Sequence, residues 1–178
     1  MVRSRAALVE WLRAGGKAKY LFFWGHQVSA EVTKQCLSQW YPAPFVVDSV
    51  HYPTAEHFMM AAKARLFGDT EVLAEILALS HPKQAKELGR SVRHFDEATW
   101  SEARFELVVA GSVAKFSQNP ALGEFLTKTG ERVLVEASPR DRIWGIGLSE
   151  QHPDASDPER WRGLNLLGFA LMEARTKL

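Results

Sequence analysis

The spacing of hydrophobic and polar positions predicts the first elements of the chain. Over residues 4–14, apolar positions such as Leu8 and Leu12 recur at helical spacing, and two glycines close the segment. The apolar run KYLFFWG, residues 19–25, favours a strand that leads into a loop. We therefore expect a short helix followed by a strand.

Capping residues and helix breakers predict three helices in the middle of the chain. Thr54 is expected to cap a helix that reaches about Leu66, and Asp69 to cap another that reaches Leu79. The segment 82–89 begins with a proline in a first-turn position and is expected to stop at its glycine.

The remaining patterns predict more helices and two short β elements. A helix is expected over 99–116, where TWSE has capping-box spacing, and others over 119–130 and 164–176. The alternating run RVLVEA, residues 132–137, is typical of a buried strand, and a hairpin is expected around 48–49. The sequence thus predicts a mainly α fold with a few short β-strands.

Length and charge limit the domain organisation and the class of ligand. The chain has 178 residues, 46% of them hydrophobic, which is enough for one domain with a buried core. We expect a single compact domain over residues 1–178. Lys and Arg total 22 against 21 Asp and Glu, so the net charge is +1. This charge does not indicate the broad basic surface that is typical of a general nucleic-acid-binding protein.

Cysteine usage and hydropathy predict where the protein is found. Cys36 is the single cysteine, so no internal disulfide can form and a reducing cytoplasm is favoured. No stretch approaches the ~18 apolar residues of a membrane span. Charged residues within the first sixteen positions replace the apolar run of a signal peptide. We expect a cytoplasmic protein that does not enter the membrane.

Residue spacing disfavours several familiar kinds of site. The histidines and the cysteine show no Cys-x-x-Cys, His-x-x-x-His or His-x-Glu pair, so a zinc site has almost no support. A phosphate-binding Gly-x-x-x-x-Gly-Lys loop is absent, and so is a dinucleotide-binding glycine motif. We expect no metal and no bound cofactor, and we expect Cys36 to be a buried, inert thiol.

Glu56 and Lys63 are the first candidates for chemistry. Seven residues separate them, which places both on nearly the same face of the predicted helix, two turns apart. They can face one cavity. The alternative is a first-turn carboxylate that complements the helix dipole, together with a solvated surface lysine.

Tryptophans provide a second group of candidates. Trp100 and Arg104 are four residues apart and share a helix face, although an arginine stem covering a core tryptophan would give the same spacing. Six tryptophans exceed what one small core needs. Trp144 lies in a glycine-flanked loop, where an aromatic ring suits a flat heterocycle.

The segment EASPRDRIWGIGL, residues 136–148, concentrates unusual residue types after a buried strand. A loop held rigidly at one end is a favourable place for chemistry. We expect Trp144 to form an aromatic wall here, while Gly145 and Gly147 permit close backbone approach or positive φ. Glu136 is expected to brace the loop from behind.

These residues resemble the NADAR, or YbiA-like, family. The segments FWG, LSQWYPAPF, YPTAEHFMMAAKA, AKELGR, AKF, LVEASPRDRIWGIGL and WRGLNLLGFALMEAR occur in the order and spacing of that family, over residues 22–175 or so. The first twenty residues lie outside it as a helical extension. The resemblance implies a single compact YbiA-like helical domain. Gln39 is a departure, since many relatives have Asn there.

The resemblance also implies an N-glycosidase that cleaves a ribosyl C–N bond. Two substrate classes are attached to the family: ADP-ribose linked to guanine, including guanine in nucleic acid, and phosphorylated ribosylamino-pyrimidines from riboflavin biosynthesis. The residues carried over by motif are Glu56, Trp100, Asp141 and Trp144, with Lys63 as a further candidate. The expected partner is thus a nucleotide-like small molecule or an ADP-ribosylated nucleic acid.

Basic side chains are candidates for gripping a phosphate. Guanidinium groups match phosphate oxygens, although each cation can instead belong to a structural ion pair. Asn165 is expected to turn the chain into the last helix, close to the same loop. The candidate substrate-contacting residues are Arg90, Trp100, Arg104, Lys115, Trp144, Gly145, Gly147 and Asn165.

Two chemical routes to C–N cleavage remain open. In the first, an ionised Asp141 stabilises the cationic sugar while Glu56, in an apolar setting, protonates the departing nitrogen; these roles can be exchanged. In the second, Lys63 captures the opened sugar as a Schiff base.

Two further classes of function stay in view. A non-catalytic reader of ADP-ribose or a nucleotide would need the same aromatic and basic groups but no carboxylate pair. A structural or interaction protein would use the tryptophans as core and the loop as a partner contact.

Overall fold

The computed structural model describes residues 2–178. The helices are α1 (Arg5–Arg13), α2 (Ala55–Leu66), α3 (Thr70–Ala78), α4 (Pro82–Arg90), α5 (Glu97–Gln118), α6 (Pro120–Lys128) and α7 (Leu166–Arg175). The strands are β1 (Tyr20–Phe23), β2 (Phe45–Val47), β3 (Val50–Tyr52) and β4 (Val133–Glu136), and two 3-10 turns are η1 (Lys34–Leu37) and η2 (Pro158–Arg160). The prediction of a mainly α fold with a few short strands is confirmed.

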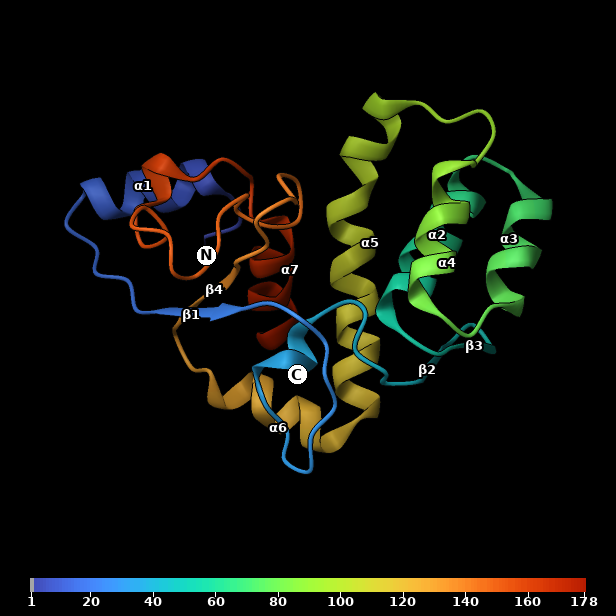
Figure 1. Cartoon of the computed structure of the whole chain (residues 1–178), viewed down its shortest axis with the longest axis horizontal. Coiled ribbons are helices and arrows are strands. Elements are labelled where there is room, and N and C mark those ends of the chain that lie inside the picture. The colour runs from blue at the N-terminus through green and yellow to red at the C-terminus, as the bar shows by residue number, and fades with distance from the viewer. Residues whose placement is uncertain (1) are drawn as a thin grey trace.

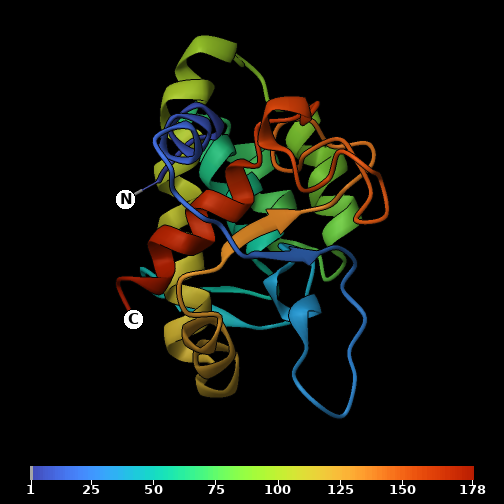
Figure 2. The same ribbon diagram turned by 90° about the vertical axis from the view of Figure 1, so that its left-hand side faces the viewer.

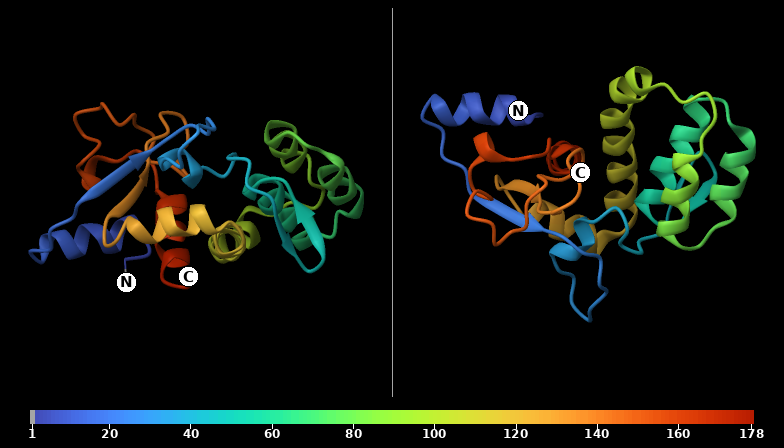
Figure 3. Two further views of the ribbon diagram at one scale, coloured as in Figure 1. Left: turned by 90° about the horizontal axis from the view of Figure 1, so that it is seen from below. Right: turned by 45° about the horizontal axis from the view of Figure 1, so that its top comes forward.

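The long helix α5 stands between two groups of elements (Figure 1). On one side lie α2, α3 and α4, which we call the helical side. On the other lie β1, β4 and α7, which we call the strand side. Helix α5 packs against α2 and α7, and α7 also packs against β4. The helix α1 lies against the segment that contains η2 (Figure 3, right).

The strands form two separate two-stranded sheets. Strands β1 and β4 are parallel, with Phe23 opposite Glu136, and Figure 2 shows them side by side, with the chain after β1 leaving the body as an extended loop. Strands β2 and β3 form the predicted hairpin beside the helical side (Figure 3, left). Its two turn residues, Asp48 and Ser49, both have positive φ, as a two-residue type I′ turn requires.

Side-chain caps set the start of most helices. The Oγ1 of Thr54 accepts from the backbone N–H of His57, as the sequence predicts for the start of α2. The predicted start of α5 at Thr99 is wrong: Asp96 is the cap, and its Oδ1 accepts from the backbone N–H of Thr99 at 2.8 Å. Helix α4 also runs one residue past Gly89.

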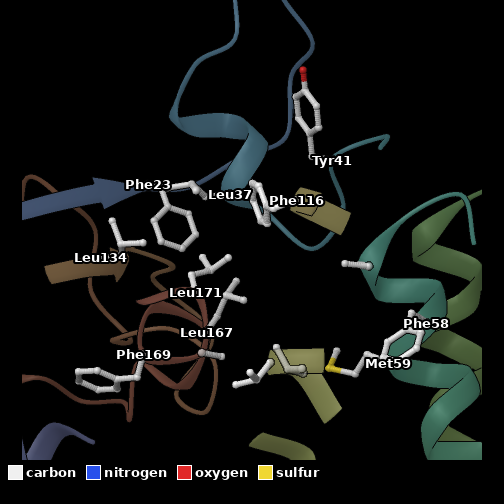
Figure 4. Packing of buried hydrophobic residues seen from close by; sticks show 14 of the residues in the cluster. Phe23, Leu37, Tyr41, Phe58, Met59, Phe116, Leu134, Leu167, Phe169 and Leu171 are labelled. Atoms are coloured by element: carbon white, nitrogen blue, oxygen red, sulfur yellow. The ribbon is translucent and has the colours of Figure 1, made fainter. Parts of the chain in front are cut away.

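The core lies where the two sides meet α5. Figure 4 shows Phe23 and Leu134 from the paired strands packing toward Leu167 and Leu171 of α7. Helix α2 is buried around nearly its whole circumference from Ala55 to Ala62, including its polar residues. Such a helix lies inside the protein, so any charged group on it faces either a partner or a cavity.

No helix within residues 2–178 combines the length and the apolar character that a membrane span requires.

Candidate active site

A cavity of about 780 Å³ opens between the helical side and the strand side. This volume lies within the range of small-molecule sites, roughly 300–1,000 Å³. The helical side contributes Glu56, Met60, Lys63, Lys86 and Arg90; the strand side and the segments after its strands contribute Trp24, Glu136, Arg140, Asp141, Arg142 and Trp144; and Trp40 comes from the segment after η1.

Glu56 is a buried acid in the first turn of α2. The side chain is only 2% exposed, and its Oε1 has no hydrogen-bond partner. Burial raises the pKa of Glu56 to about 7, against the opposing influence of Lys86 and the indole of Trp40. Its backbone N–H donates to the carbonyl of Gln39, the position that departs from many relatives. Glu56 does lie in the first turn of α2, as the alternative has it, but its side chain is buried and lines the cavity.

Lys63 lies two turns further along α2 and faces the same cavity. Its Nζ donates to the carbonyl of Gly89 at 2.7 Å and lies 4.1 Å from the centroid of the Phe95 ring. Burial lowers the pKa of Lys63, and Glu97 partly offsets this. A Cβ at Gly89 would lie 2.0 Å from the Met60 sulfur, which is why a glycine stands there inside α4.

Asp141 organises the loop over residues 137–148, which we call the Asp141 loop. Its Oδ1 accepts from the backbone N–H groups of Ile143 and Trp144 at 2.9 and 2.8 Å. One carboxylate oxygen thus holds the turn that sets the direction of Trp144. Asp141 and Trp144 both line the cavity.

The two glycines predicted as contacts shape the Asp141 loop instead of lining the cavity. A Cβ at Gly145 would lie 2.9 Å from the carbonyl oxygen of Glu136. Gly147 has a φ of +69°, which disfavours any residue with a side chain. They keep the loop against β4.

Glu136 is a third carboxyl group at this cavity. Its Oε2 is buried and has no hydrogen-bond partner. Burial, together with Asp141, raises the pKa of Glu136 to about 8. The sequence prediction gave this residue a bracing role only; its position at the end of a buried strand was the available signal that it would be buried as well.

Cations surround the acids. Arg90 lines the cavity as predicted, with Lys86 one turn before it on α4. Arg140 and Arg142 flank Asp141 and also line it. Sequence reasoning missed these three, although the i, i+4 spacing with Arg90 and the motif around Asp141 pointed to them.

Three indole rings line the cavity. Trp144 was predicted, whereas Trp24 and Trp40 were not singled out, although both lie within the motifs shared with the NADAR family. Trp24 is 61% exposed, which places it at the rim. The Trp40 ring packs against the ring of His26 at a centroid distance of 5.4 Å. Flat rings in this arrangement suit a planar base.

Besides the two glycines, four predicted contact residues lie outside the cavity lining. Trp100 is part of the core, with its ring centroid 5.8 Å from the Nζ of Lys63. Arg104 pairs with Glu97 on the same helix at 3.4 Å. Trp100 is thus a core residue beside the cavity-lining Lys63, and Arg104 belongs to an ion pair, as the structural alternatives allowed.

The other two are buried and serve the backbone. Lys115, only 1% exposed, donates from its Nζ to the carbonyls of Cys36 at 2.7 Å and Ser38 at 2.8 Å, and burial lowers its pKa to about 7. Asn165 donates to the carbonyl of Leu134 and accepts from the backbone N–H of Glu136, both at 2.9 Å. Cys36 is buried as predicted, and burial raises the pKa of its thiol to about 11.

The arrangement has three chemical capacities. The tryptophans can hold a planar base, and the cations can hold phosphate oxygens. Glu56 and Asp141 are carboxyl groups in unlike settings, one fully buried and one partly exposed, which is the condition for dividing acid and base tasks.

Comparison with known proteins identifies the family of this chain. The NADAR domain matches residues 22–178. An N-glycosidase of Acanthamoeba polyphaga mimivirus is 41% identical over 162 residues, covering 88% of this chain and 95% of that protein. The N-glycosidase YbiA of Escherichia coli K12 is 31% identical over 135 residues, 76% of each chain. A riboflavin biosynthesis protein of Vibrio vulnificus is 30% identical over 142 residues, which are 80% of this chain and 35% of that one.

A solved structure has the same fold. The NMR structure of Escherichia coli YbiA superposes with a TM-score of 0.69 at 27% identity, covering 91% of this chain and 86% of that one. The ordered motifs, the fold and a match over residues 22–178 agree. This chain belongs to the NADAR family.

Proposed function

We propose that this protein hydrolyses the ribosyl C–N bond of an ADP-ribosylated guanine, in a nucleotide or in nucleic acid. The observation that supports this most is the set of unlike carboxyl groups, Glu56 and Asp141, at one cavity with Trp144. The chain is an N-glycosidase, a hydrolase of N-glycosyl bonds, as are its relatives by name. A cytoplasmic location is part of the proposal, supported by the free buried thiol of Cys36.

The cations and the volume favour ADP-ribose as the sugar part. Lys63, Lys86, Arg90, Arg140 and Arg142 can face a pyrophosphate, which needs more positive charge than one phosphate does. A cavity of about 780 Å³ with three indole rings has room for two ring systems. A phosphorylated ribosylamino-pyrimidine is the second candidate, favoured by the name of the Vibrio vulnificus relative.

Hydrolysis needs two proton transfers. As the C–N bond breaks, its electron pair leaves with the base nitrogen, and Glu56 donates the proton that neutralises it. Positive charge then develops at the sugar carbon, where Asp141 stabilises it. Water adds to that carbon, and the proton that it loses passes to the Glu56 carboxylate, directly or by way of Asp141. Glu56 is then protonated again and Asp141 is ionised, as at the start.

The Schiff-base route through Lys63 makes a separate prediction. The amine is partly desolvated and lies in the cavity, as that route requires. Lys63→Arg retains the positive charge but cannot form an imine. Full activity of Lys63→Arg in the base-release assay would exclude the covalent route, whereas an imine trapped by borohydride on the wild type would support it.

The deciding experiment compares the wild type with Asp141→Asn on two substrates, ADP-ribosyl-guanine and a ribosylamino-pyrimidine phosphate. Free base is followed by chromatography. Release from one substrate, lost in the variant, would support the reaction class and identify the target. Glu75→Gln, an exposed acid on α3, is the matched control and should retain wild-type activity.

Two other outcomes would change the proposal. No release from either substrate, with ADP-ribose binding intact, would favour the non-catalytic reader. For a nucleic-acid substrate, ADP-ribosylated single strands and duplexes should be compared, because the net charge of +1 favours a short single-stranded end over tracking along a duplex.

A further inference from the structure

We propose that Glu136 contacts the base of the substrate through the edge that carries an N–H group beside a carbonyl. This inference rests on the proposed function and names the part of the substrate that the third carboxyl group recognises. Guanine and the pyrimidine candidate both have such a lactam edge.

The position of Glu136 is fixed by three independent contacts. Its backbone N–H donates to the Oδ1 of Asn165 at 2.9 Å, and its carbonyl accepts from the backbone N–H of Ile146 at 2.9 Å. It also stands opposite Phe23 in the β1–β4 pair. A side chain on so rigid a backbone keeps its carboxyl group at one place in the cavity lining.

One oxygen of the Glu136 carboxyl group, Oε2, is buried and has no hydrogen-bond partner, and the same holds for Oε1 of Glu56 in the same cavity lining. The residue as a whole is half-buried. A buried polar atom without a partner destabilises the folded protein. Native proteins keep few such atoms, and a bound ligand is one of the ways in which they are satisfied.

The charges around Glu136 favour its neutral form. Asp141 of the loop is a negative neighbour and Lys86 of α4 is a positive one that opposes it, while Glu56 of α2 adds to the effect of Asp141 when it is ionised. Asn165, the N-cap of α7, and Phe23 of β1 carry no charge. Burial is the largest cause, and it raises the pKa of Glu136 to about 8. Near neutral pH the group therefore offers an O–H donor next to a carbonyl acceptor.

A neutral carboxyl group complements a lactam edge with two hydrogen bonds. Its O–H donates to the base carbonyl, and its own carbonyl accepts from the base N–H. An ionised carboxylate could only accept, so the base carbonyl would face a negative oxygen. Contact with the base should therefore weaken as the pH rises through the pKa of Glu136.

The test measures the binding of free guanine and 1-methylguanine by calorimetry, in wild type, Glu136→Gln and Glu136→Ala. The methyl group blocks the N–H of the lactam edge. In the wild type, guanine should bind about tenfold more tightly than 1-methylguanine. In Glu136→Ala this preference should disappear. Glutamine has the donor and acceptor of the neutral acid, so Glu136→Gln should keep the preference and lose the weakening near pH 8.

Each result decides the inference separately from the proposed function. Two results would overturn the inference. The first is a preference for guanine over 1-methylguanine that survives in Glu136→Ala. The second is an equal loss of this preference in Glu136→Gln and Glu136→Ala, because a neutral glutamine should replace a neutral acid and fails only where the ionised form is needed. These binding measurements need no turnover. If the wild type releases no base, the proposed function fails while the contact of Glu136 is still tested. Thermal unfolding of both variants checks that they fold.

Discussion

At the scale of single residues, the burial of Glu56 makes it the strongest candidate for the acid. Glu56→Gln removes the proton donor with almost no change in shape. We expect kcat to fall by about 10²–10⁴, the usual contribution of a general acid or base, with a smaller change in KM. The measurement is steady-state base release, with Glu75→Gln as control. A rise in KM with kcat unchanged would show that Glu56 only binds the substrate.

The raised pKa of Glu136 makes stability depend on pH. Between its ordinary value of 4.5 and about 8, the folded protein holds a proton that the unfolded chain has lost, so this group's contribution to stability falls as the pH rises through that window. Glutamine does not titrate, so the stability of Glu136→Gln lacks this fall with rising pH. We expect the Tm of the variant to match wild type near pH 5 and to exceed it increasingly up to about pH 8–9. A difference independent of pH would contradict this.

Single residues also mark the limit of sequence prediction at the site. Glu56, Asp141 and Trp144 are found from the sequence because each belongs to a short, unusual motif. The burial of Lys115 and of the Oε2 atom of Glu136 depends on segments that are remote in the chain. Lys115 appeared as a candidate phosphate ligand, whereas its Nζ instead holds two carbonyls near η1. No local pattern distinguishes these two uses of a lysine.

At the scale of elements, Asn165 connects α7 to β4 and thereby positions Glu136. The residue is fully buried, has a φ of +55°, and makes two hydrogen bonds to the strand. We expect Asn165→Ala to lower the free energy of unfolding by about 2–4 kcal/mol, since two buried backbone groups lose their partners. Urea unfolding measures this.

Asn165→Gly separates the two causes. Glycine accepts the positive φ but makes neither hydrogen bond, so the variant should be less stable than wild type and more stable than Asn165→Ala. Wild-type stability of Asn165→Gly would show that the hydrogen bonds contribute little.

Elements with local signals were predicted, and the pairing between distant elements was not. Thr54, Asp69 and the prolines locate the helices because caps act within a single turn. The start of α5 was misplaced because Asp96 and Thr99 are both competent caps, and the structure uses Asp96. The two predicted strands exist, but their parallel pairing has no signal within either strand.

At the scale of the whole molecule, the cavity is built from both sides of α5. A ligand that contacts Lys86 and Arg142 together would link the helical side to the strand side. We expect ADP-ribose at 100 times its Kd to raise the free energy of unfolding by about 2.7 kcal/mol. Hydrogen exchange should slow in α2 and in the Asp141 loop together. Protection confined to one of them would contradict binding between the sides.

The parallel pairing of β1 with β4 has a consequence for biosynthesis. Phe23 of β1 pairs with Glu136 of β4, which lies far along the chain. Strand β1 therefore leaves the ribosome long before β4, the strand with which it pairs. At about 5–20 residues per second, the wait is roughly 5–20 s. During that time an apolar strand edge is open to other chains. The most vulnerable period of this protein therefore falls in its synthesis, and a chaperone that covers residues 20–23 would protect it.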